Sequence, residues 1–140
     1  MNGTVTVELH AEVDLSVLMR QAGAFLRRLG LDAEERDRLL TVAMELARNI
    51  LKYARTGLVR LSSERRREAV VVRVEATDRG PGIADVALAL TDRYSTGGSL
   101  GLGLPGVRRM VDRMEIESVP GNGTRVLAER CVTPRSGGRS

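Results

Sequence analysis

The pattern of apolar and polar positions predicts one strand and then two amphipathic helices in the first part of the chain. Apolar and polar residues alternate over residues 4–9, which is typical of a half-buried strand. Apolar residues then recur at helical spacing over residues 16–29 and again over residues 32–55. We therefore expect a strand, a helix and a second, longer helix in this order.

Residues with capping tendencies stand at the ends of both predicted helices. Asp14 and Asp32 occupy positions where a side chain can cap a helix N-terminus. Glu35, three residues after Asp32, gives the spacing of a capping box. Gly30 and Gly57 lie at the other ends, where glycine commonly terminates a helix.

The second half of the chain predicts a hairpin, a turn, a glycine-rich stretch and a closing hairpin. The run "ERRRE" is flanked by carboxylates and predicts a polar hairpin tip. The segment before "DRGPGIAD" is largely apolar and predicts a central strand. We expect strands at residues 58–63, 68–77, 115–119 and 124–132, and helices at about residues 85–90 and 104–114.

The order of these elements decides the fold class that we expect. Strands and helices are both plentiful, but they do not alternate regularly along the chain. This order favours an α+β fold, a two-layer α/β sandwich in which helices cover one face of a mixed, mostly antiparallel sheet.

The length of 140 residues corresponds to one domain that can bury a core without metal or disulfide staples. We expect this domain over residues 1–133, with a flexible tail over residues 134–140. Cys131 is the only cysteine, which excludes an internal disulfide and a thiolate metal cluster. No apolar run approaches the roughly 20 residues that span a bilayer, so we expect a cytoplasmic protein without membrane contact.

The net charge of +4 raises the question of nucleic acid as a partner. Lys52 is the only lysine, and the arginines are scattered among 18 acidic residues. The three aromatic residues, Phe25, Tyr53 and Tyr94, are too few for a base-stacking platform. Nucleic acid is therefore not an expected partner.

Five glycines between Gly97 and Gly106 lead directly into a predicted helix. Glycine lets a ligand approach the backbone, and a helix N-terminus attracts anions, so phosphate is the expected ligand. The letters "GLGLPG" match the dinucleotide pattern G-x-G-x-x-G, but no apolar strand leads into them. A Walker A loop needs a lysine after its last glycine, and none follows Lys52.

Two further polar groupings have both an ordinary and a chemical interpretation. Glu45 and Asn49 stack one helical turn apart, on the side opposite the apolar face. They form either a solvated helix face or a site where the carboxylate handles a proton and the amide oxygen binds Mg²⁺. Asp78 ends an apolar strand, and Gly80 and Gly82 follow it. One interpretation of these three residues is an ordinary turn. The other is that the glycines leave room for a flat ligand to approach the backbone.

Taken together, "ELARN", "DRGPG" and "GLGLPG" followed by "GNGT" resemble the N, G1 and G2 boxes of the GHKL superfamily of ATP-binding domains. Within it, "ELARNILKYA", "DRGPGI" and "YSTGGSLGLGLPGVRRMVDRMEIESVPGNGT" are similar to the RsbT-type switch kinases, which are bacterial serine/threonine protein kinases of the stressosome. The resemblance runs from about Val5 to Val132. Arg79 departs from the usual neutral residue, and Leu102 is closer to the anti-sigma kinases.

The resemblance implies an ATP site with Mg²⁺ as cofactor. Asp78 would accept a hydrogen bond from the adenine amino group, with Thr124 assisting at the adenine end. Gly80 and Gly82 correspond to the G1 glycines, and Asn49 would supply an oxygen to Mg²⁺. Backbone N–H groups would bind the phosphates at Gly101, Leu102, Gly103 and Leu104, and residues 85–101 would form a mobile lid.

The same resemblance implies a function. Glu45 matches the catalytic carboxylate that orients the acceptor hydroxyl, and the acceptor would be a STAS-domain protein of the RsbS or RsbR kind. The released kinase would then activate a PP2C-type phosphatase in a partner-switching stress response. The alternative is an RsbW-type anti-sigma factor that sequesters a sigma subunit. The sequence leaves open whether the chain forms a homodimer, and whether Arg48 contacts phosphate, partner or solvent.

Overall fold

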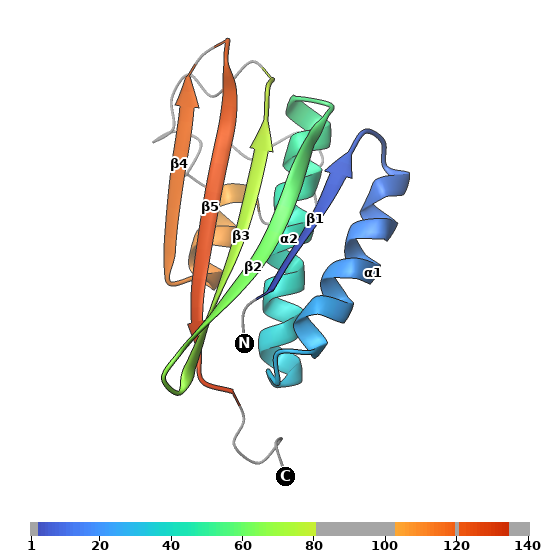
Figure 1. The fold of residues 1–140 in the computed structure, drawn as a ribbon. Coiled ribbons are helices and arrows are strands. Elements are labelled where there is room, and N and C mark those ends of the chain that lie inside the picture. Colours follow the sequence, from blue (N-terminus) through green and yellow to red (C-terminus); the bar gives the residue numbers. More distant parts are fainter. Residues whose placement is uncertain (1–2, 81–102, 120, 135–140) are drawn as a thin grey trace.

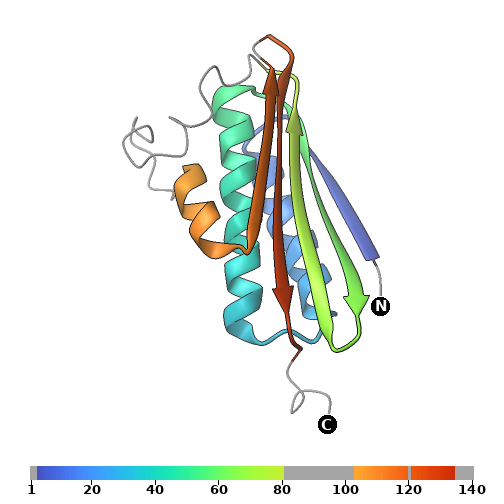
Figure 2. The ribbon, with the colours of Figure 1, turned by 90° about the vertical axis from the view of Figure 1, so that its left-hand side faces the viewer.

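The computed structural model describes residues 3–80, 103–119 and 121–134, in which helices cover one face of a five-stranded sheet (Figure 1, Figure 2). The strand order is β1-β2-β3-β5-β4, and each neighbouring pair is antiparallel. The expected two-layer α+β fold is confirmed. The elements are β1 (Gly3–Leu9), α1 (Val13–Arg27), α2 (Ala33–Tyr53), β2 (Gly57–Arg66), β3 (Ala69–Asp78), α4 (Gly103–Met110), β4 (Arg113–Val119) and β5 (Gly123–Val132).

Strand β3 lies at the centre of the sheet, as its apolar run predicts. Val70, Val72 and Val74 alternate along it and pack into the core beneath the helices. Leu18 and Leu26 of α1 enter the same core and are almost completely buried. The burial of these side chains fixes which face of the sheet the helices cover.

Helix α1 begins earlier than expected, and Asp14 is not its N-cap. The N-cap position belongs to Glu12, whose side chain makes no capping hydrogen bond. The Asp14 carboxylate instead accepts the backbone N–H groups of His10 at 2.7 Å and Ala11 at 3.0 Å, which lowers its pKa. Asp14, in the first turn of α1, thus stabilises the connection between β1 and α1 through its side chain.

Helix α2 begins as predicted, but only half of the expected capping box forms. Asp32 is the N-cap and accepts the Glu35 N–H at 2.9 Å. The Glu35 carboxylate pairs with Arg130 of β5, at 3.1 Å from Nε and 2.8 Å from Nη2. This two-pronged bond ties the start of α2 to the sheet and raises the pKa of Arg130.

Replacing Glu35 by glutamine is expected to lower the free energy of unfolding by about 1–2 kcal/mol, because it removes a partly buried, charge-assisted pair. The matched control is Glu34→Gln, an exposed acidic residue in the same helical turn. It changes the helix-dipole interaction equally but leaves Arg130 paired. Urea unfolding of both variants measures the difference, and equal losses would contradict the role given to this pair.

Helix α4 is shorter than expected, because residues near its predicted end belong to the sheet. It ends at Met110, and Met114 pairs with Ala128 of β5. Asp112 fixes the turn between them by accepting the Cys131 N–H at 2.7 Å and an N–H of Arg130 at 3.2 Å. Cross-strand pairing therefore overrides the local helical pattern here.

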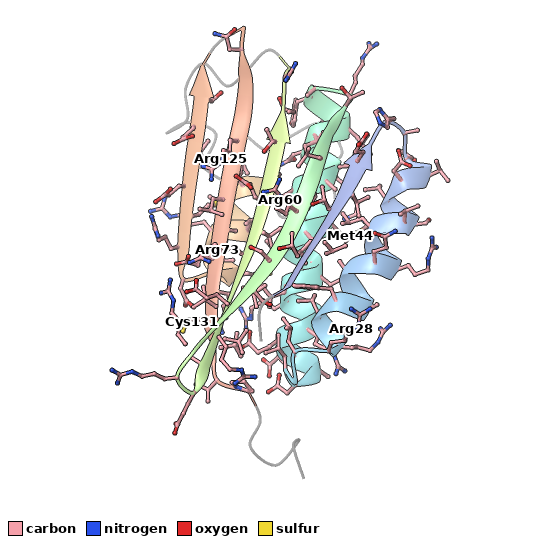
Figure 3. The ribbon with its side chains drawn as sticks, in the orientation of Figure 1. Arg28, Met44, Arg60, Arg73, Arg125 and Cys131 are labelled. Carbon is pink, nitrogen blue, oxygen red and sulfur yellow. The ribbon has the colours of Figure 1, made fainter. Side chains whose placement is uncertain are left out.

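The face of the sheet turned away from the helices carries a network of arginines and glutamates, with Arg60, Arg73 and Arg125 on adjacent strands (Figure 3). Arg73 contacts Glu129 at 2.7 Å and Glu64 at 3.2 Å. Arg60 and Arg125 share Glu75. On this face, glutamates thus neutralise much of the arginine charge. In the described residues, no helix has the length and apolar character needed to cross a membrane.

Candidate ATP site

A row of residues crosses the sheet at the carboxyl end of β3. Asp78 pairs with Gly57 of β2 and with Thr124 of β5, and Thr124 pairs with Ser118 of β4. Directly paired residues share a face of the sheet, and Asp78 lies two residues after the buried Ala76. The row therefore faces the helix layer, at the end of the sheet where α2 terminates (Figure 1).

Two hydroxyl groups of this row are hydrogen-bonded to each other. The Ser118 Oγ and Thr124 Oγ1 atoms are 3.0 Å apart, and Ser118 also donates to the Gly123 carbonyl at 3.4 Å. Sequence reasoning selected Thr124 and missed Ser118, although its place just before the "PGNG" turn puts it in register. Ser118 fixes the orientation of the Thr124 hydroxyl.

Replacing Ser118 by alanine is expected to weaken the binding of Mg·ATP about two- to tenfold, because a freely rotating Thr124 hydroxyl must be ordered when nucleotide binds. Calorimetric titration of both proteins with Mg·ATP measures this change. A Ser62→Ala variant on β2, whose position belongs to the opposite face of the sheet, is the control. An unchanged dissociation constant for Ser118→Ala would contradict the proposed role.

The Asp78 carboxylate is held in place by its own turn. Its Oδ1 atom accepts the Gly80 N–H at 2.8 Å. Its second oxygen has no hydrogen-bond partner among the described residues, so it can accept a bond from a ligand. The partly buried carboxylate is therefore preorganised as an acceptor at the end of β3.

Three segments meet almost backbone to backbone around Asp78. A Cβ atom added at Gly80 would lie 2.5 Å from the Cβ of Ala54, just after α2. One added at Gly123, whose φ is +100°, would lie 2.2 Å from the Asp78 carbonyl oxygen. Glycine is therefore required at both positions, as the motif predicts for Gly80.

Glu45 and Asn49 lie on the flank of α2 that faces α4. They continue the stripe of helical positions that includes Glu35, which reaches Arg130 on the β5 side of the sheet. Glu45 is only 7% exposed and Asn49 is partly buried. The expected position of Glu45 on the side opposite the apolar face is therefore wrong, because its side chain is buried. Helix α4 packs on α2 in the fold.

The buried Glu45 carboxylate has a cationic partner that the sequence left without a role. Its Oε2 atom lies 3.0 Å from Nη1 of Arg48, whose side chain is about half exposed. The i, i+3 spacing of these residues was the available signal, but surface pairs of this kind are frequent. The burial of Glu45 distinguishes this pair from them.

Helix α4 brings the described part of the glycine motif to the same region. Gly103 and Leu104 form its first turn, and both are buried. Gly103 has a φ of +63°, a conformation that favours glycine. The predicted residues Gly82, Gly101 and Leu102 lie outside the described residues, as do the expected helix at 85–90 and the lid at 85–101.

The donor atoms here are compatible with a magnesium ion shared with phosphates. The described residues contain no group of three acidic, histidine or cysteine side chains that could hold a metal by themselves. Mg²⁺ commonly keeps several waters and takes only one or two protein oxygens in addition to phosphate oxygens. The Asn49 amide oxygen, on the same flank as Glu45, fits this requirement.

Comparison with known proteins identifies relatives of this chain. Residues 8–129 match the histidine kinase-like ATPase domain family. The serine/threonine-protein kinase RsbT of Bacillus subtilis (strain 168) is 38% identical over 129 residues, which cover 91% of this chain and 96% of RsbT.

Solved structures share the fold at low sequence identity. The SiaB-SiaC complex from Pseudomonas aeruginosa matches with a TM-score of 0.56 and 12% identity, over 91% of this chain and 89% of the matched chain. The RsbU and RsbW domains of Rv1364c from Mycobacterium tuberculosis match with a TM-score of 0.61 and 17% identity, over 96% of this chain and 33% of that chain. The chain belongs to the histidine kinase-like ATPase domain family and, within it, is a serine/threonine protein kinase of the RsbT type.

Proposed function

We propose that this kinase transfers the γ-phosphoryl group of ATP to a STAS-domain protein of the RsbS or RsbR kind. After its release from that protein it activates a PP2C-type phosphatase. The observation that carries the proposal is the 38% identity to RsbT over 91% of the chain. It is supported by Asp78, whose carboxylate is held at the end of β3, and by the buried Glu45 of α2.

The adenine base is recognised by the row at the end of β3. The free carboxylate oxygen of Asp78 accepts a hydrogen bond from the adenine amino group, and Thr124 assists directly or through water. A guanine base presents a carbonyl at the matching edge, which a carboxylate repels. Gly80 and Gly82 leave room for the flat ring to approach the backbone.

The residues at the start of α4 would hold the phosphates. The backbone N–H groups of Gly101, Leu102, Gly103 and Leu104 bind them, aided by the partial positive charge of the helix N-terminus. Asn49 holds Mg²⁺ through its amide oxygen. The ion offsets the negative charge of the phosphates when it is bound.

Glu45 acts on the acceptor hydroxyl. The hydroxyl oxygen forms a bond to the γ-phosphorus, and the bond from that phosphorus to the bridging oxygen breaks, so that ADP leaves with the electron pair. The Glu45 carboxylate orients the hydroxyl and takes its proton.

Intact-mass spectrometry tests the proposal. Each STAS-domain protein encoded in the same genome is incubated with this kinase and Mg·ATP, and Glu45→Ala serves as the inactive control. Gain of one phosphate, absent with the control, supports the proposal and identifies the substrate. No transfer to any of them while ATP still binds contradicts it, and co-purification with a sigma subunit would then establish the RsbW-type alternative.

A further inference from the structure

Glu45 requires a counter-charge because its carboxylate lies where water hardly reaches. The residue is 7% exposed. Charged side chains are rarely buried to this degree unless they are paired, because desolvation penalises the isolated charge. Among the described residues, the cation within salt-bridge distance of Glu45 is Arg48.

Arg48 reaches Glu45 from the outer side of α2. Its side chain is 52% exposed, and Nη1 lies 3.0 Å from Glu45 Oε2. Position 48 lies roughly opposite Leu39, Leu46 and Ile50, which face the sheet core. The Arg48 guanidinium therefore lies at the solvent-exposed side of α2 and contacts one oxygen of the buried Glu45 carboxylate.

Two other charged residues on this flank of α2 have partners of their own. Glu35, near the start of the helix, pairs with Arg130, and Arg38 turns toward Glu35 at 3.7 Å. On α4, Arg108 and Arg109 are exposed, whereas Leu104 and Val107 supply the buried contacts. Arg48 is thus the cation placed to hold Glu45.

We propose that Arg48 is a positioning residue for Glu45 in phosphoryl transfer, an inference that rests on the proposed function. Arg48 holds Oε2 through one N–H and so restricts the rotation of the carboxylate. The other oxygen, Oε1, receives the proton of the acceptor hydroxyl as the oxygen–phosphorus bond forms and ADP leaves. A guanidinium suits this task because its N–H groups point in fixed directions and its charge is permanent.

The first test separates catalysis from binding. Arg48→Met is expected to lower kcat for phosphorylation of the STAS-domain acceptor roughly 10- to 100-fold. This loss is part of the rate enhancement that a positioned general base contributes. The KM for the acceptor and the affinity for Mg·ATP should change less than about threefold. Arg48→Lys should recover part of kcat, since a lysine supplies the charge without the fixed N–H directions.

The decisive test is a double-mutant cycle with Glu45→Gln. If Arg48 acts through Glu45, Arg48→Met lowers the residual rate no further in the Glu45→Gln protein. If Arg48 only contacts the acceptor, the substitution raises KM and has the same effect in both backgrounds, which overturns the inference. Arg20→Met, an exposed arginine on α1, is the control for loss of surface charge.

The outcomes distinguish this inference from the proposed function. A wild-type protein that phosphorylates no STAS-domain acceptor overturns both. A wild-type protein that does so, together with an Arg48→Met protein of equal kcat, overturns only the role of Arg48. Thermal unfolding of each variant confirms that folded proteins are compared, and Arg48→Lys keeps the test valid if Arg48→Met unfolds.

Discussion

Replacing Asp78 by asparagine is expected to weaken Mg·ATP binding about 10- to 100-fold while the fold is retained. The amide oxygen of asparagine can still accept the Gly80 N–H, which Asp78 Oδ1 accepts at 2.8 Å. The other carboxylate oxygen becomes an NH₂ donor that faces the donor of adenine. Loss of a hydrogen bond to a charged group corresponds to about 1.5–3 kcal/mol, hence the expected range.

Calorimetric titration with Mg·ATP and Mg·GTP measures this change and the base preference. The preference for ATP over GTP should fall in Asp78→Asn, because an amide can donate to the guanine carbonyl. Asp37→Asn, an exposed residue on α2, removes the same charge far from the row. An Asp78→Asn protein with wild-type affinity would contradict the adenine role of Asp78.

Replacing Gly123 by alanine is expected to reduce the free energy of unfolding by more than about 3 kcal/mol. The added Cβ would lie 2.2 Å from the Asp78 carbonyl oxygen, in a backbone with a φ of +100°. Both β3 and β5 would have to shift to relieve this contact, and the row containing Thr124 would lose its register. ATP binding should be lost together with stability.

Gly121→Ala separates the clash from the backbone strain. Gly121 also has a positive φ, +85°, but nothing lies within 4 Å of an added Cβ. Its substitution should cost only about 1–2 kcal/mol, the strain of a left-handed backbone. Urea unfolding of both variants measures the difference, and equal losses would show that close packing against Asp78 is unimportant.

Much of the fold could be predicted because it depends on local patterns. The helical periodicity of residues 32–55 and the Asp32 cap correspond to α2, and the apolar run near Val72 predicts the central strand. The motifs around Asp78 and "ELARN" predicted the family, which the comparisons confirm.

The features that sequence reasoning missed depend on residues far apart in the chain. Glu45 is buried, and α4 packs on α2 in the fold. Contacts between elements so far apart in the chain cannot be predicted from helical periodicity within α2. Only half of the predicted capping box forms, because the Glu35 carboxylate pairs with Arg130, which is distant in the sequence. Likewise, the Ser118–Thr124 pair depends on strand register rather than on a motif.

Binding of ATP at the end of the sheet formed by Asp78 and Thr124 can be tested by backbone amide NMR, with signals recorded before and after Mg·ATP is added to the protein. We expect the largest changes at Asn49, Asp78, Gly80 and Thr124, with the signals of the β2–β3 tip near Arg67 unchanged. Changes centred on that tip or on the open face of the sheet, with these four residues unaffected, would contradict it.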